Sequence, residues 1–215
     1  LRPRRLAAGP YPDGVHPRLR LTVMTVVTLV ILTAGVVVLA SDPSPSVAPA
    51  PTGTFAGGIR PPGPAVDLAL RDQEGRTVRS RDLRGRPVIV TFLYTQCQDD
   101  CPTMAAQIRL ALDRLDEPAP VLAVSVDPAN DTEAARRRFV TRHYLTGRMR
   151  FLNGAAGDLQ RVWRTFGIRP QEAGREHSAY VVVLDPAGHQ RVSFPVDRLT
   201  PEGLAHDVRA LGAGA

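Results

Sequence analysis

The sequence contains no lysine, so all 27 of its basic residues are arginine. We attribute this to compositional bias and not to function. The formal net charge of +6 is unevenly spread: residues 1–20 hold five arginines against one acid, and residues 41–215 hold 22 arginines against 20 acids. Because the larger part of the chain is nearly neutral, we do not expect a surface that follows nucleic-acid phosphates.

Cysteine is almost absent, since Cys97 and Cys101 are the only two in 215 residues. No cysteine lies directly after the long apolar run at 21–40, which argues against anchoring through a lipid-modified cysteine. Both cysteines follow an apolar stretch at 87–94 and precede a segment with helical spacing. We therefore expect both thiols at a strand-to-helix junction, where free backbone N–H groups and the helix dipole favour a thiolate.

The one long hydrophobic run, residues 21–40, carries no charge. As a helix it would span about 30 Å, the thickness of a bilayer core. Arg18 and Arg20 precede it, so the positive-inside bias predicts a cytoplasmic tail at 1–20, a single transmembrane helix at 21–40 in the cell membrane, and an extracytoplasmic main domain. A cleaved signal peptide is the alternative. Either way we expect the main domain to be exported to an oxidising compartment, where two thiols can form a disulfide bond.

Residues 41–64 hold seven prolines and predict an extended linker without a core of its own. From 65 to 215, apolar runs alternate with helical patterns. We expect strands at 65–70, 88–94, 121–126, 179–184 and 190–194, and helices at 102–115, about 132–144 (capped by Asp131 or Thr132), around 159–166, and 201–211. This alternation predicts an α/β fold with a mixed sheet flanked by helices. A thiol pair after the first central strand, at a helix start, is typical of the thioredoxin-like class.

Two cysteines four residues apart can share one face of a helix. The pair can then close a disulfide if the first turn relaxes slightly. It can also bind one soft metal, and thiolates select Cu(I), zinc or iron–sulfur clusters. Two sulfurs do not fill a coordination sphere, so a metal site needs a third ligand.

Histidine supplies the candidates for that ligand. His16 precedes the apolar run, and His143, His189 and His206 are expected at the surface of a helix, a turn and the last helix. His177 differs because it immediately precedes the predicted strand at 179–184. In thioredoxin-like folds this loop faces the thiol pair and usually carries a cis-proline. Residues 174–178 contain no proline and place an imidazole there, so we favour His177 over the alternative of a loop histidine that caps the strand.

Several short segments together resemble one family: 72–76 (DQEGR), 82–87 (DLRGRP), 95–102 (TQCQDDCP), 125–128 (SVDP) with 131–132 (DT), and 177–178 (HS). Over about residues 60–200 the chain is similar to the SCO/SenC family of copper proteins, membrane-tethered thioredoxin-like domains implicated in cytochrome c oxidase assembly. The resemblance implies that Cys97, Cys101 and His177 are the copper ligands. The chain departs from the family at Gln98, where proline usually follows the first cysteine, and at Glu176, where aspartate usually precedes the histidine.

The leading hypothesis is a membrane-anchored copper chaperone. Copper, as Cu(I) or Cu(II), would bind Cys97, Cys101 and His177 and pass to the dinuclear copper site of cytochrome c oxidase subunit II, a partner implied by the resemblance. The alternative is a thiol–disulfide oxidoreductase in which Cys97 attacks and Cys101 resolves. The missing cis-proline and the three-residue spacer argue against a general reductase. A peroxidase is disfavoured because Tyr94 occupies the position where such sites place threonine, and a purely structural domain with a surface disulfide is a further alternative.

Three other features favour structural roles over chemistry. The arginines at 136–138 are expected on a solvated helix face and not at an anion site. Trp163 and Phe166, at helical spacing, are expected in the core. Met104 lies near the thiols, but its place in the apolar stripe of its helix predicts core packing in preference to metal binding.

Overall fold

The computed structural model describes residues 21–31, 55–171 and 179–213. The chain divides into two units, residues 1–50 and 51–215. In the first unit, residues 21–31 form a helix with exposed side chains. Across the three described ranges, no helix has both the length and the apolar character that a bilayer span requires. The predicted transmembrane helix is therefore not confirmed, and its remainder, residues 32–40, lies outside the described residues.

A six-stranded mixed sheet forms the centre of the second unit, in the order β1-β8-β7-β4-β5-β6. Its strands are β1 (Gly58–Ile59), β4 (Val88–Leu93), β5 (Val121–Ser125), β6 (Met149–Leu152), β7 (Tyr180–Leu184) and β8 (Gln190–Pro195). β4, β5 and β6 run parallel to one another, whereas β7, β8 and β1 pair antiparallel. A separate hairpin pairs β2 (Ala69–Arg71) with β3 (Thr77–Arg79). The predicted mixed sheet is confirmed.

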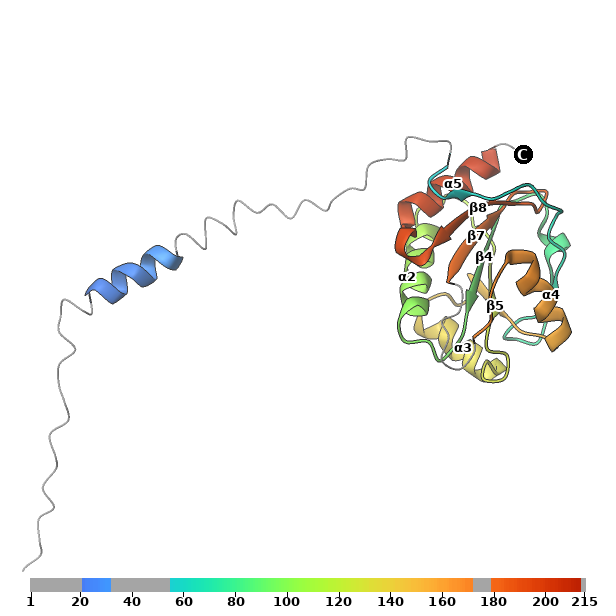
Figure 1. Cartoon of the computed structure of the whole chain (residues 1–215), viewed down its shortest axis with the longest axis horizontal. Coiled ribbons are helices and arrows are strands. Elements are labelled where there is room, and N and C mark those ends of the chain that lie inside the picture. The colour runs from blue at the N-terminus through green and yellow to red at the C-terminus, as the bar shows by residue number, and fades with distance from the viewer. Residues whose placement is uncertain (1–20, 32–54, 172–178, 214–215) are drawn as a thin grey trace, which may run out of the picture. The chain divides into compact units, whose positions relative to one another are not determined.

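Helices cover both faces of this sheet (Figure 1). α2 (Asp100–Leu112), α3 (Glu133–Arg142) and α5 (Pro201–Ala213) pack on one face, and α4 (Ala156–Phe166) packs on the other. Two short 3-10 turns, η1 (Ser80–Leu83) and η2 (Val196–Arg198), complete the described elements. The layered arrangement confirms the α/β class with a sheet flanked by helices.

Strand β4 divides the interior into two hydrophobic cores. All six of its residues are buried, as expected for a strand covered on both faces. Ile89 and Leu93 pack with Met104 and the other inward residues of α2. Val90 and Phe92 point the opposite way, because successive strand side chains alternate, and pack with α4. The predictions that Met104, Trp163 and Phe166 are core residues are confirmed.

Two of the strands missing from the sequence prediction show why short elements escape it. β6 has four residues, and the exposed Arg150 interrupts its apolar pattern. β1 lies inside the predicted linker at 41–64, where glycine and proline hide it. The structure corrects that boundary, since the folded part already includes Gly58–Ile59 paired with β8.

Asp207 on α5 holds the segment before β1 against the domain. Its side chain is fully buried, and its two carboxylate oxygens accept the N–H groups of Ala56 and Gly57, each at 2.8 Å. A Cβ added at Gly57 would lie 2.8 Å from the ring of Phe194, so only glycine allows this close approach. Composition alone could not reveal the segment's attachment, because its acceptor lies about 150 residues further along the chain.

Candidate metal centre

The two cysteines lie where β4 gives way to α2. Cys97 is in the connecting loop, and Cys101 is the second residue of α2. The backbone N–H of Cys101 donates to the sulfur of Cys97 at 3.2 Å. The predicted strand-to-helix junction is confirmed, although Cys97 precedes the helix and so does not share a helical face with Cys101. Both residues are free thiols, Cys101 fully buried and Cys97 partly exposed.

The surroundings shift the pKa values of the two thiols in opposite directions. A hydrogen bond from the Cys101 side chain, with further bonds from the backbone N–H groups of Cys101 and Asp99, lowers the pKa of Cys97 to about 6 against the cost of its partial burial. The same contact with Cys97, together with burial, raises the pKa of Cys101. At neutral pH the pair therefore holds one accessible thiolate and one buried thiol.

This asymmetry predicts selective alkylation of the reduced domain. Iodoacetamide reacts with thiolates, so Cys97 should be modified first and Cys101 should stay unmodified in the folded protein. Because the Cys97 pKa is lowered to about 6, the rate should rise as pH increases through 6 and level off above about pH 7. Mass spectrometry of peptides after timed quenching measures this, and a rate that rises only near pH 8.5, the ordinary value for cysteine, would contradict it.

Tyr94 is a member of this site that the sequence did not assign a role. It follows β4 and contacts both hydrophobic cores. The carbonyl of Tyr94 accepts the N–H of Cys97 at 3.4 Å. Burial, followed by the charge of Cys97, raises the pKa of the Tyr94 phenol to about 12, so this side chain stays a neutral hydrogen-bonding group beside the thiolate.

Asp131 anchors the loop that carries Cys97. This aspartate is fully buried; one carboxylate oxygen accepts the N–H of Thr95 at 2.7 Å and the other accepts the hydroxyl of Ser125 at 2.5 Å. Burial raises its pKa. The next residue, Thr132, caps α3 by accepting the N–H of Ala135. The end of β5, the start of α3 and the thiol loop are thus tied at one carboxylate.

Arg136 corrects the prediction of a solvated arginine face. Its side chain is only 3% exposed, and its guanidinium donates to the backbone carbonyls of Arg71, Asp131 and Phe151. Its two neighbours, residues 137 and 138, are exposed as predicted. The buried guanidinium joins β2, β6 and the Asp131 turn beneath the thiol loop.

The third ligand is not placed by the structure. His177 and Glu176 lie outside the described residues, so the role of His177 stays a prediction. Among the residues that are described, no group of three or more His, Cys, Asp or Glu side chains could hold a metal ion.

The other described histidines have local contacts away from the thiols. The ring of His143 lies 4.4 Å from that of Phe139, and burial lowers its pKa. Nδ1 of His189 lies 2.9 Å from the carbonyl oxygen of Gly63. Nδ1 of His206 lies 2.8 Å from the carboxylate of Asp207. All three side chains are partly exposed, in keeping with the surface positions predicted for them.

The donor set suits a soft, monovalent cation. Two sulfur ligands, one of them already a thiolate near neutral pH, match the preference of Cu(I) for thiolates. The partly exposed Cys97 offers a point of entry, while the buried Cys101 lies in an environment that excludes water. Met104 is fully buried in the core and fills space there.

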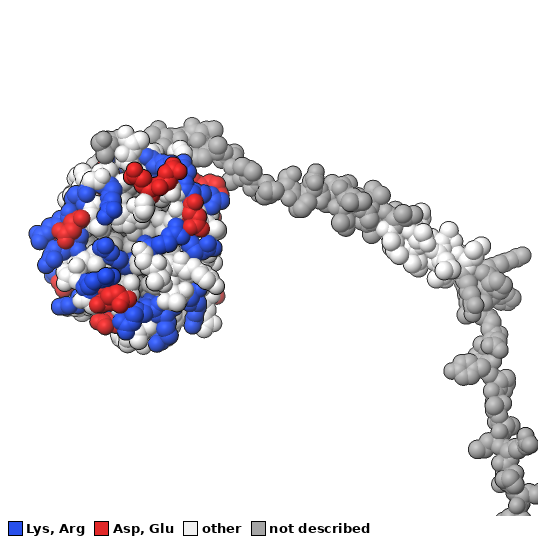
Figure 2. Space-filling view, turned by 180° about the vertical axis from the view of Figure 1, so that it is seen from behind, with Lys and Arg blue, Asp and Glu red and all other residues white. Residues whose placement is uncertain are grey.

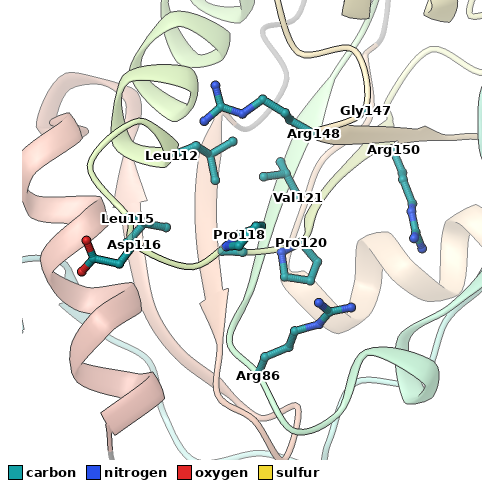
Figure 3. Close-up of a pocket in the computed structure, with 11 residues that line it drawn as sticks. Arg86, Leu112, Leu115, Asp116, Pro118, Pro120, Val121, Gly147, Arg148 and Arg150 are labelled. Atoms are coloured by element: carbon teal, nitrogen blue, oxygen red, sulfur yellow. The ribbon is translucent and has the colours of Figure 1, made fainter.

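A separate hollow of about 400 Å³ opens at the other end of the sheet (Figure 3). Its lining includes Arg86, Pro120 and Arg148, which lie one or two residues before the first residues of β4, β5 and β6. These three strands are parallel, and the thiols follow the carboxyl end of β4. This hollow, at the amino ends of the strands, and the cysteines therefore lie at opposite ends of the sheet. No cysteine or histidine lines it, so it is separate from the candidate metal centre.

Comparison with known proteins agrees with this geometry. The SCO1/SenC family pattern matches residues 65–212. The mitochondrial SCO2 homolog of Bos taurus is 29% identical over 135 residues, which cover 57% of this chain and 50% of that protein. The chain thus matches about half the length of this curated relative.

Solved structures share the fold. ScoI of Bradyrhizobium japonicum, determined with copper bound, is 25% identical with a TM-score of 0.55, covering 68% of this chain and 98% of that one. BsSco, described as a member of the Sco family of cytochrome c oxidase assembly proteins with a disulfide switch, is 20% identical with a TM-score of 0.61, covering 72% and 98%. With the family pattern matched over most of the folded unit, the chain belongs to the SCO1/SenC family.

Proposed function

We propose that this chain binds copper through Cys97 and Cys101, with His177 as the third ligand, and delivers it during assembly of cytochrome c oxidase. The observation that carries the proposal is the pairing of a partly exposed thiolate with a buried thiol at the start of α2. The copper-bound relative ScoI supports the choice of metal. The recipient we propose is the dinuclear copper site of subunit II, as the family resemblance implies.

We also propose that the protein works outside the cytoplasm, attached to the cell membrane. The uncharged run at 21–40 would be the anchor, and residues 1–20 would be a cytoplasmic tail. The proline-rich residues after the run would serve as a tether. The functional domain would extend to residue 215, and its start moves from residue 65 to about residue 55, since β1 and its attachment to Asp207 belong to the fold.

A second candidate function is thiol–disulfide exchange, and the separation of the two pKa values favours it. An accessible thiolate at Cys97 can attack a partner disulfide, and the buried Cys101 can then release the partner by closing the Cys97–Cys101 disulfide. In the first step Cys97 forms a mixed disulfide with one partner sulfur and the other partner sulfur leaves as a thiolate. In the second step Cys101 loses its proton to solvent and attacks Cys97, and the remaining partner sulfur leaves as a thiolate. The two functions use the same residues and differ in whether copper is needed.

Copper titration of the exported domain tests the proposal. The reduced domain should bind one equivalent of Cu(I), the oxidised domain should bind none because its sulfurs are joined, and His177→Ala should weaken binding about 10–100-fold. An unchanged affinity in His177→Ala would overturn the three-ligand site. In the same preparation kept free of metal, rapid turnover of a disulfide peptide would favour the oxidoreductase instead.

A further inference from the structure

A hollow of about 270 Å³ lies beside the thiol loop. Its lining includes Thr95 and Gln96 of the thiol loop, and Arg138 and Arg142 of α3. The remaining lining residues are Asn130, Thr132, Ala135 and Phe139. Because Gln96 immediately precedes Cys97, a group held in this hollow would lie next to the residue that carries the reactive sulfur.

The described residues that line this hollow carry a net positive charge. Arg138 and Arg142 are exposed and four residues apart on α3, so they share one face of the helix. None of the eight lining residues is acidic, and neither arginine forms an ion pair with a carboxylate of the described residues. By contrast, Asp116 lines the hollow at the far end of the sheet together with Arg86 (Figure 3), and on the face in Figure 2 arginines and acidic residues are interspersed.

The chemistry of the lining suits a carboxylate. A guanidinium presents parallel N–H donors that match the two oxygens of a carboxylate group. Thr95, Gln96, Asn130 and Thr132 add neutral hydrogen-bonding groups to the lining. On the other side of Cys97, Asp99 and Asp100 follow it in the chain and are exposed. The exposed residues that follow Cys97 are thus acidic, whereas the hollow lined by Thr95 and Gln96 carries two arginines.

We propose that this hollow, formed by α3 and the thiol loop, is the docking point for an acidic segment of the protein that exchanges thiol or copper with Cys97. The inference rests on the proposed function and names the chemistry of its partner. A carboxylate close in sequence to the partner's cysteine binds between Arg138 and Arg142, and this contact directs that cysteine toward Cys97. The polarity of the surface fixes one orientation of the partner.

Charged disulfide peptides test this directly. Three hexapeptides, each with one cysteine activated as a 2-pyridyl disulfide, carry aspartate, serine or arginine on both sides of that cysteine. The Cys97 thiolate attacks the peptide sulfur, a new disulfide forms, and pyridine-2-thiolate leaves with the electron pair, so absorbance follows the rate. At low ionic strength the metal-free wild-type domain should react about tenfold faster with the aspartate peptide than with the arginine peptide.

The double variant Arg138→Gln/Arg142→Gln should reduce this ratio to below about threefold and leave the rate with the serine peptide unchanged. The matched control is Arg86→Gln/Arg150→Gln, which removes the same charge at the opposite end of the sheet (Figure 3) and should keep the wild-type ratio. Equal losses in both double variants, a ratio unaffected by the first, or a wild-type preference for the arginine peptide would each overturn the docking point.

Copper titration of the same variants separates this inference from the proposed function. Arg138→Gln/Arg142→Gln should bind Cu(I) as tightly as the wild type, because neither arginine belongs to the ligand set. If the wild-type domain binds no copper and the charge preference still depends on Arg138 and Arg142, the copper function fails and the docking point stands. If copper binds and the charge preference is absent, the docking point alone fails.

Discussion

Replacing Cys97 by serine or Cys101 by alanine is expected to lower the Cu(I) affinity of the reduced domain by more than about 100-fold. Each change removes one of the two sulfur ligands of the proposed site. Alanine is the better choice at Cys101, because that side chain is fully buried and a serine hydroxyl there would lose its hydrogen bonds to water. Anaerobic competition against a chromogenic Cu(I) chelator measures the affinity.

Met104→Leu is the matched control for the loss of sulfur. Met104 carries the nearest other sulfur in the sequence and is fully buried in the same core as Cys101. Leucine conserves its volume, so the cost in stability should stay below about 1.5 kcal/mol and copper affinity should not change. Single cysteine variants that keep wild-type affinity would show that the pair does not hold the metal.

Replacing Arg136 by alanine is expected to lower the free energy of unfolding by about 3–5 kcal/mol. The guanidinium satisfies three backbone carbonyls, those of Arg71, Asp131 and Phe151, and it is buried, so water cannot easily replace it. Chemical denaturation of the reduced domain, followed by circular dichroism, measures the loss. The variant should also alkylate faster at Cys101, because the support of the thiol loop through Asp131 is weakened.

Arg137→Ala controls for the charge and for the helix position. Arg137 is exposed and donates one hydrogen bond, to the carbonyl of Gln73 at 2.8 Å. Its loss should cost less than about 1 kcal/mol. Similar losses of unfolding free energy in Arg136→Ala and Arg137→Ala would mean that the buried Arg136 guanidinium does not stabilise the fold as the structure indicates.

Arg136 also shows what the sequence could not predict. Three consecutive arginines in an amphipathic helix favour a solvated face, and two of them follow that pattern. The acceptors that draw Arg136 inward come from residues 71 and 151, which are 65 and 15 positions away in the chain. No local pattern reports such partners, whereas the long apolar runs of β4, β5 and β7 predicted buried strands because burial on both faces leaves a local signature.

The candidate site, too, has features that the local sequence predicts and features that depend on distant residues. Its location after β4 followed from the order of an apolar run, two cysteines and a helical pattern, all within 30 residues. The difference in pKa between the two thiols did not follow from the sequence. It arises from the hydrogen bond between Cys101 and Cys97 and from their different burial. The support from Asp131 was also missed, although its motif was recognised, because its contact with Thr95 crosses 36 positions of sequence. The assignment of His177 remains a prediction from the family pattern.

The attachment of the first folded residues to Asp207 has a mechanical consequence. A pull on the chain at residue 55 would load two hydrogen bonds to one carboxylate and the two-residue strand β1. β8 and β7 lie between β1 and the strand that leads to Cys97. Tension would therefore detach the outer strands of the sheet before it strained the loop that carries Cys97.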